Sequence, residues 1–272
     1  MDTLSLILTF IFGVIVGSFL NVVALRFNTG MGIGGRSKCM SCGTSLTWKE
    51  LIPLFSFALQ KGACKKCRSK ISWQYPLVEF IAGAIFVLIF FAFPPVDVLT
   101  GVATLIQDII VCLLIVISVY DIKHKIIPDS FVYTFAGLAL LNLCVGGSSW
   151  WHMPTLEMLL AGPLLAVPFA LLWLVSKGKW MGFGDVKLML GIGWLLGVSA
   201  GINALVLAFW IAAAASLVWL FATQKKFKPK TEIPFGPYLI LGLYLVLIFH
   251  IQVIDIHLLR DIIMSYFPNF KV

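Results

Sequence analysis

Long apolar runs constrain the fold of this chain more than any other feature. A helix needs about 20 apolar residues to cross a bilayer. About eight runs approach or reach that length, at residues 4–25, 77–95, 99–120, 131–146, 156–175, 186–200, 202–222 and 238–254. Charged residues make up 12% of the sequence, roughly half the share found in soluble domains. The sequence therefore predicts an all-α polytopic membrane protein with about eight transmembrane helices.

The basic residues predict how these helices are oriented. Most of the 20 Lys and Arg residues fall in the polar connections after the first, third, fifth and seventh runs. Only Arg260 and Lys271 follow the eighth. The basic connections then share one side of the membrane, which the positive-inside rule makes the cytoplasm. The net charge of +8 indicates orientation and contact with anionic lipid head groups. No aromatic–basic interleaving indicates binding to nucleic acid.

The largest polar stretch, residues 26–76, divides the chain into four expected parts. These are a first transmembrane helix (1–25), a cytoplasmic insertion (26–76), a seven-helix membrane domain (77–255) and a non-cytoplasmic tail (256–272). Asp2 precedes the first run and Arg26 follows it. A cleavable signal peptide has its positive charge in front, so we expect the first run to remain as a span.

The insertion contains two CxxC pairs, Cys39 with Cys42 and Cys64 with Cys67. Each pair offers two thiolates from one tight turn, and two turns complete a closed tetrahedral S4 site of the structural zinc type. Disulfides or a redox pair are the alternatives. A cytoplasmic location disfavours disulfides, and no βαβ pattern surrounds either pair. The insertion is therefore predicted to bind zinc. Cys112 and Cys144 lie alone in apolar runs and are interpreted as packing residues.

Two carboxylates stand out at the ends of apolar runs. Asp121 ends the third run, and Asp185 opens the sixth within Gly182-Phe183-Gly184-Asp185. The predicted topology brings both to the cytoplasmic face, where ionisable groups are costly and a functional role is the default hypothesis. Two carboxylates that meet there can share a proton, so that one activates water and the other protonates a carbonyl. The alternative is that they are interfacial charges that pair with Lys123 and Lys187.

Several neighbouring residues have simpler interpretations. Asp108 lies about 20 Å before Asp121 along a helix, which is too far to replace it. Asp129 follows a proline and precedes an apolar run, as a helix N-cap does. Gly182 and Gly184 would permit close approach of a substrate backbone. The later series Gly193, Gly197 and Gly201 is expected to serve tight helix packing.

The ordered motifs resemble those of the type IV prepilin peptidases, a family of GxGD-type aspartic membrane proteases. Along nearly the whole chain they are Gly17-Ser18-Phe19-Leu20-Asn21-Val22-Val23, the paired CxxC knuckles, Ile52-Pro53, Tyr75-Pro76-Leu77-Val78-Glu79, Ile127-Pro128-Asp129, Gly182-Phe183-Gly184-Asp185-Val186-Lys187 and Pro234-Phe235-Gly236-Pro237.

This resemblance implies that Asp121 and Asp185 are the catalytic aspartates. It also implies cleavage of a short basic leader from prepilins or pseudopilins, on the cytoplasmic side of a bacterial inner membrane. The new N-terminal residue would then be methylated with S-adenosylmethionine. No GxGxxG follows a predicted strand, so no motif locates the methyl-donor site. Glu79 is a candidate for holding a cation there, and a salt bridge to a nearby Lys or Arg is the alternative.

Two other classes of function are alternatives to this one. A proton-coupled transporter could use Asp108, Asp121 and Asp185 as a relay, but the inverted repeats typical of transporters are missing from the sequence. A membrane scaffold could recruit a partner through the zinc module, but it would leave the two aspartates without a role. The oligomeric state does not follow from the sequence.

Overall fold

The computed structural model describes residues 3–30, 32, 34–145, 153–223 and 233–255. The predicted tail 256–272, with Arg260 and Lys271, lies outside the described residues. Helices α1 to α4 belong to one compact unit and α5 to α8 to a second. Extended pairing within the described part of the chain is limited to two isolated β-bridges. The predicted all-α class is therefore confirmed.

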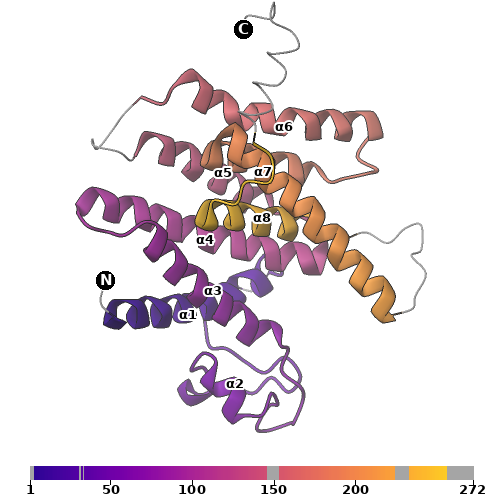
Figure 1. The fold of residues 1–272 in the computed structure, drawn as a ribbon. Coiled ribbons are helices and arrows are strands. Elements are labelled where there is room, and N and C mark those ends of the chain that lie inside the picture. The colour runs from indigo at the N-terminus through magenta and orange to yellow at the C-terminus, as the bar shows by residue number, and fades with distance from the viewer. Residues whose placement is uncertain (1–2, 31, 33, 146–152, 224–232, 256–272) are drawn as a thin grey trace, which may run out of the picture. The chain divides into compact units, whose positions relative to one another are not determined.

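The first unit is built on three apolar helices, α1 (Thr3–Arg26), α3 (Gln74–Ala92) and α4 (Val98–His124), which contact one another (Figure 1). Glycines bring α1 and α3 together, since a Cβ on Gly13 would lie 2.9 Å from Gly83 Cα. Such small residues allow helix backbones to approach closely inside a membrane. Asn21 is 1% exposed, and its Nδ2 donates to Tyr75 O at 3.2 Å. The end of α1 is thereby tied to the start of α3.

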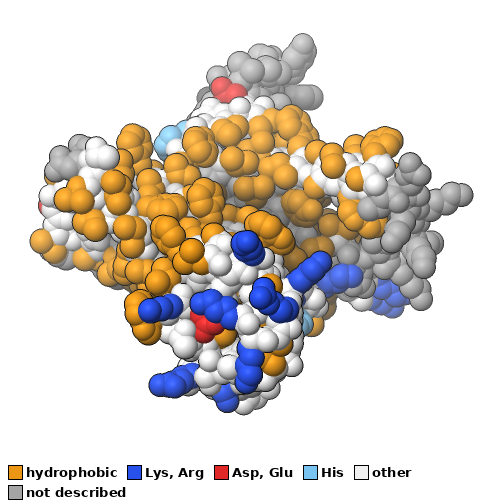
Figure 2. Space-filling view, turned by 90° about the horizontal axis from the view of Figure 1, so that it is seen from below, with side chains coloured by type: hydrophobic (Ala, Val, Ile, Leu, Met, Phe, Trp, Pro, Cys, Tyr) orange, Lys and Arg blue, Asp and Glu red, His pale blue; other side chains and the backbone are white. Residues whose placement is uncertain are grey.

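The polar insertion leaves the end of α1 and returns at the start of α3 (Figure 1). It carries a 3-10 helix, η1 (Trp48–Glu50), and a short helix, α2 (Phe55–Leu59). Lys and Arg side chains gather over it, whereas hydrophobic side chains dominate the helical surfaces (Figure 2). This contrast is what a domain outside the bilayer needs next to helices inside it.

The second unit contains α5 (Asp129–Cys144), α6 (Leu156–Ser176), α7 (Phe183–Thr223) and α8 (Gly236–Phe249), and α7 contacts each of the other three. The predicted runs 186–200 and 202–222 both fall within α7. Gly197 interrupts the helix with φ 78° and ψ 176°, a backbone conformation that suits glycine. Gly193 does pack tightly, since a Cβ there would lie 2.7 Å from Gly162 Cα. Gly197 instead provides the break.

Five helices are long and apolar enough to cross a membrane, namely α1, α3, α4, α6 and α7, while α5 and α8 are shorter apolar helices. The 16 residues of α5 extend about 24 Å, somewhat less than the apolar thickness of a bilayer of about 30 Å. Counting α7 as two helices across its break, the described residues contain as many apolar helices as the sequence predicts. The chain is thus a multi-pass membrane protein by helix length and composition.

Candidate functional site

The four insertion cysteines come together in the first unit. Their Sγ atoms all lie within 4.8 Å of one another, and Cys39 Sγ is 3.8 Å from Cys67 Sγ. A tetrahedral S4 site with metal–sulfur bonds of about 2.3 Å requires sulfur separations of about 3.8 Å. All four cysteines are free thiols. The cluster therefore has the composition and size of a closed metal site, as the spacing predicts.

The two cysteine knuckles share one local fold. In the first, Cys39 N donates to Thr44 O and Gly43 N donates to Cys39 O, both at 2.9 Å. In the second, Cys64 N donates to Ser69 O and Arg68 N to Cys64 O, again at 2.9 Å. Each turn closes on a residue with positive φ, 68° at Gly43 and 59° at Arg68. The hydrogen bonds within each turn therefore orient its two sulfur atoms without help from long-range packing.

At Cys39 and Cys67 the surrounding hydrogen bonds also favour the thiolate. Backbone N–H groups of Cys42 and Ser41, with the Ser69 hydroxyl, lower the pKa of the Cys39 thiol to about 6. The side-chain and backbone donors of Ser69 likewise lower the pKa of Cys67. Metals bind the deprotonated thiol, so this chemistry fits a metal ligand set.

Asp121 lies in the last turn of α4 in the first unit and is 5% exposed. Its neighbours in that turn are packed against the end of α1, since the rings of Tyr120 and Phe27 meet edge to face at 5.6 Å. The helix places this buried carboxylate at the edge of a membrane-length apolar segment. Burial of an ionisable group at such a place is typical of a functional residue.

Asp185 lies in the first turn of α7 in the second unit and is 8% exposed. Lys187 reaches away to the start of α5, where its Nζ donates to Asp129 Oδ1 at 2.6 Å. The same ammonium lies over the ring of Tyr133 at 4.8 Å. The Lys187 ammonium thus forms an ion pair with Asp129. The N-cap interpretation of Asp129 did not foresee this ion pair.

The two glycines before Asp185 differ in their surroundings. A Cβ on Gly184 would lie 2.7 Å from Ile127 Cβ, while the nearest atom to a Cβ on Gly182 is Gly184 N at 3.9 Å. Gly184 is therefore required by packing against the Ile127-Pro128 segment. The role of Gly182 in admitting a substrate backbone remains a prediction. Asp121 and Asp185 belong to different compact units of the chain.

Glu79 is buried in α3, with 7% exposure. Its Oε2 accepts the backbone N–H of Leu54 at 2.8 Å, a partner in the insertion that neither interpretation of the sequence foresaw. Leu54 has φ 62°, a conformation that is strained for a branched side chain. Glu79 therefore anchors a strained turn of the insertion to the membrane helix.

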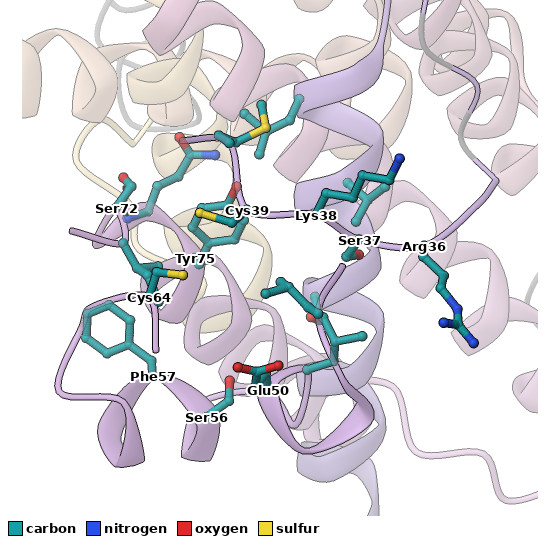
Figure 3. Close-up of a pocket in the computed structure, with 18 of the residues that line it drawn as sticks. Arg36, Ser37, Lys38, Cys39, Glu50, Ser56, Phe57, Cys64, Ser72 and Tyr75 are labelled. Carbon is teal, nitrogen blue, oxygen red and sulfur yellow. Dashed lines mark hydrogen bonds between the residues drawn. The ribbon is translucent and has the colours of Figure 1, made fainter. Parts of the chain in front are cut away.

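Glu79 also lines a cavity of about 690 Å³ in the first unit, between α1, the insertion and the start of α3. Glu50 and Ser56 lie at one edge of it and Arg36 and Lys38 at another (Figure 3). Thr47 donates its backbone N–H and its hydroxyl to Glu50 Oε2, each at 2.8 Å. Carboxylates and basic residues thus both contribute to the lining of this cavity.

The cavity could not be located from the sequence. The Cys39 and Cys64 side of the insertion forms part of its wall, together with Tyr75 at the start of α3 (Figure 3). Tyr75 precedes Glu79 by one helical turn, and this spacing is the only local signal that the two share a face. The rest of the lining comes from loop residues that only the folded insertion brings together.

Two family models match the chain. The bacterial peptidase A24 N-terminal domain matches residues 11–93, and the type IV leader peptidase family matches residues 109–217. Together they cover the insertion, Glu79, Asp121 and Asp185.

Curated relatives are similar over most of the chain. A prepilin leader peptidase/N-methyltransferase from Bacillus subtilis is 29% identical over 92% of this chain and 96% of its own length. One from Xanthomonas campestris pv. campestris is 29% identical over 89% and 91%. One from Klebsiella pneumoniae is 33% identical over 73% and 88%. No solved structure matches the chain significantly.

Proposed function

Because the chain belongs to the type IV leader peptidase family, we propose that Asp121 and Asp185 are the carboxylates with which it hydrolyses its substrate. The chain cleaves the leader peptide of type IV prepilins and N-methylates the new N-terminal residue, the two activities that its relatives' names state. It is an enzyme with peptidase and methyltransferase activity.

The observation that carries the catalytic assignment is the burial of two carboxylates at the ends of apolar helices. Asp121 closes α4 and Asp185 opens α7, and neither is more than 8% exposed. A buried charge is costly unless a function or partner retains it. By the positive-inside rule, the basic connections favour a cytoplasmic location for both helix ends, and this supports the proposal that the two carboxylates act as a pair.

In the proposed reaction, one carboxylate removes a proton from water as its oxygen attacks the scissile carbonyl carbon. The other, protonated, donates its proton to the carbonyl oxygen, and the C–N bond then breaks with proton transfer to the departing amine. Like charges held close share one proton readily, which gives the acid and base forms that the reaction needs. The substrate is a prepilin or pseudopilin with a short basic leader, and cleavage occurs at the cytoplasmic face of a bacterial inner membrane.

The cysteine cluster is proposed to hold zinc. Four thiolates leave no ligand position open, so the ion would be structural. Cys39, Cys42, Cys64 and Cys67 would hold it, and the free energy of binding would stabilise the insertion. Lys38, Lys65, Lys66 and Arg68 are next to the ligands in sequence and would offset the negative charge of a zinc–thiolate centre.

The methyl group is proposed to come from S-adenosylmethionine, as the N-methyltransferase names of the relatives imply. When bound, this cofactor supplies an electrophilic methyl group. Glu79 is the proposed residue for its positive charge. This role for Glu79 is supported by the cavity that it lines, because Tyr75, Arg36 and Lys38 line the same cavity.

The decisive experiment uses a prepilin and labelled S-adenosylmethionine with the detergent-purified protein, and scores cleavage and methyl transfer separately. Asp121→Asn and Asp185→Asn should each abolish cleavage while the protein still inserts. Asp108→Asn is the matched control, because it removes a carboxylate from the same helix as Asp121 and should leave cleavage intact. Normal cleavage by either active-site variant would refute the assignment. Loss of activity in Asp108→Asn would instead favour a relay through the membrane.

A further inference from the structure

We propose that the cavity of about 690 Å³ in the first unit is the methyl-donor site, where S-adenosylmethionine binds with Glu79 facing its positive charge. This inference rests on the methyltransferase activity proposed above and gives that activity a location. No motif in the sequence marks the site.

The size and lining of the cavity suit this ligand. Pockets for small molecules typically measure about 300–1,000 Å³. S-adenosylmethionine combines an aromatic purine, ribose hydroxyls, a sulfonium and an amino-acid group with both charges. The rings of Tyr75 and Phe57 can contact the purine, while Arg36 and Lys38 can pair with the carboxylate. The purine, the carboxylate and the positive charge of the donor therefore each have a proposed partner among the residues that line the cavity.

Glu79 is held in place for this role. Its Oε2 is fixed by the Leu54 N–H at 2.8 Å, and the carboxylate is 7% exposed. A buried carboxylate is costly in free energy unless a cation compensates its charge, and a sulfonium or ammonium group supplies such a cation. The strained φ of 62° at Leu54 is also informative, because strained backbone is retained mainly at ligand clamps and active sites.

The charge of the lining argues against the basic leader peptide as the occupant. Besides Arg36 and Lys38, the cavity is lined by Arg26, Lys70 and Lys123. These side chains would repel a leader that carries several Lys or Arg residues, whereas the donor has a carboxylate that can pair with one of them and a single net positive charge that Glu79 can face. A small zwitterionic ligand with an extra cation fits this arrangement better.

The cavity also lies next to the end of α4 that carries Asp121. Lys123, two residues after Asp121 on the same helix, is part of its lining. The amine released by cleavage would therefore form close to the donor. That amine loses a proton to water, and its nitrogen lone pair then attacks the methyl carbon. The carbon–sulfur bond breaks with its electrons moving to sulfur, which leaves S-adenosylhomocysteine and a methylated ammonium.

The test measures donor binding directly, by equilibrium dialysis of tritium-labelled S-adenosylmethionine against the detergent-purified full-length protein without prepilin. Ser56→Trp places an indole in the cavity from α2. Ala58→Trp is the matched control, because Ala58 is exposed on the same short helix and does not line the cavity. Glu79→Gln removes the charge but keeps an oxygen that accepts the Leu54 N–H.

Wild-type protein and Ala58→Trp should bind the donor equally. Ser56→Trp and Glu79→Gln should each bind it at least about tenfold more weakly, the effect of losing one favourable charged contact or the space for the ligand. Zinc content and prepilin cleavage report whether Ser56→Trp is folded; if it is not, Glu79→Gln alone decides. After ultraviolet irradiation, the label should be on a peptide from residues 26–79.

Two results would overturn the location. One is wild-type affinity in Ser56→Trp and Glu79→Gln; the other is labelling of a peptide from α6, α7 or α8. If the wild-type protein still methylates cleaved prepilin, only the location has failed. If the wild-type protein neither binds the donor nor transfers a methyl group, the proposed methyltransferase activity itself has failed.

Discussion

Gly184 tests how the start of α7 positions Asp185. In Gly184→Ala the new Cβ would lie 2.7 Å from Ile127 Cβ and 3.2 Å from its Cγ1 and Cδ1. Non-bonded carbons are optimally about 3.5–4.0 Å apart, so the two segments must separate by roughly 1 Å. Ile127 is 8% exposed, and the following proline restricts its backbone. We therefore expect the first turn of α7 to shift.

That shift acts on the next residue, Asp185. Misplacing a reacting group by about 1 Å can cost about 100-fold in rate, and overpacking costs about 1–3 kcal/mol of stability. We expect kcat/KM for prepilin cleavage to fall by about 100-fold, with the variant still folded. Methylation of a prepilin cleaved beforehand should be unchanged, because the proposed donor site lies in the other unit. The assay follows both reactions with purified protein.

The control is Gly137→Ala in α5, where a Cβ would meet nothing within 4 Å, and it should cleave like the wild type. Ile127→Gly should restore part of the activity to Gly184→Ala because it removes the nearest atom. Ile127→Ala should not, since it keeps that Cβ. Wild-type cleavage by Gly184→Ala, or equal rescue by both Ile127 variants, would refute the packing argument.

Three further predictions concern the metal, the ion pair and a helix end. Metal analysis should find about one zinc per chain, lost in Cys64→Ser, and chelation should harm methylation more than cleavage. Lys187→Met should slow cleavage severalfold by releasing the 2.6 Å pair with Asp129. Asp129→Asn should slow cleavage less than Lys187→Met does, because the aromatic contacts of Lys187 remain. An equal loss of cleavage rate in the two variants would contradict this reasoning. The Thr100 backbone N–H lowers the pKa of Asp97. The ionised Asp97 carboxylate therefore stabilises the fold at pH values above the ordinary carboxyl pKa of about 3.9, and this stabilisation is lost as the pH falls and the carboxylate is protonated. Asp97→Asn should therefore lower the melting temperature at pH 7, and its difference from the wild type should shrink as the pH falls below that pKa.

Local patterns predicted several features well. The CxxC spacing led to a four-sulfur cluster because each knuckle closes through its own turn, as at Cys39 with Thr44. The positions of Asp121 and Asp185 in the terminal turns of helices followed from where the apolar runs stop. The break at Gly197 was missed because a glycine series on a helix face suits packing as well as an interruption, and only its φ of 78° distinguishes them.

Local sequence patterns did not predict which residues far apart in the sequence become hydrogen-bond or ion-pair partners. Glu79 was predicted to face a Lys, an Arg or a ligand cation, and the structure adds a partner that the sequence did not indicate: its carboxylate accepts the Leu54 N–H across 25 residues of sequence. Lys187 was an alternative partner for Asp185 by sequence, and the structure pairs it with Asp129 at a separation of 58 residues. Such pairings depend on how loops and helix ends pack, which periodicity does not encode.

The sequence by itself determined the membrane class, the sulfur cluster and the candidate carboxylates, because apolar length, knuckle spacing and isolated charges are local properties. Only the tertiary structure decided that Gly184 is held against Ile127 and that Glu79 anchors a strained turn. It alone revealed the cavity beside α4, because its wall is assembled from α1, the insertion and α3. Buried polar groups must find partners wherever the fold brings them, and those partners are set by packing rather than by position along the chain.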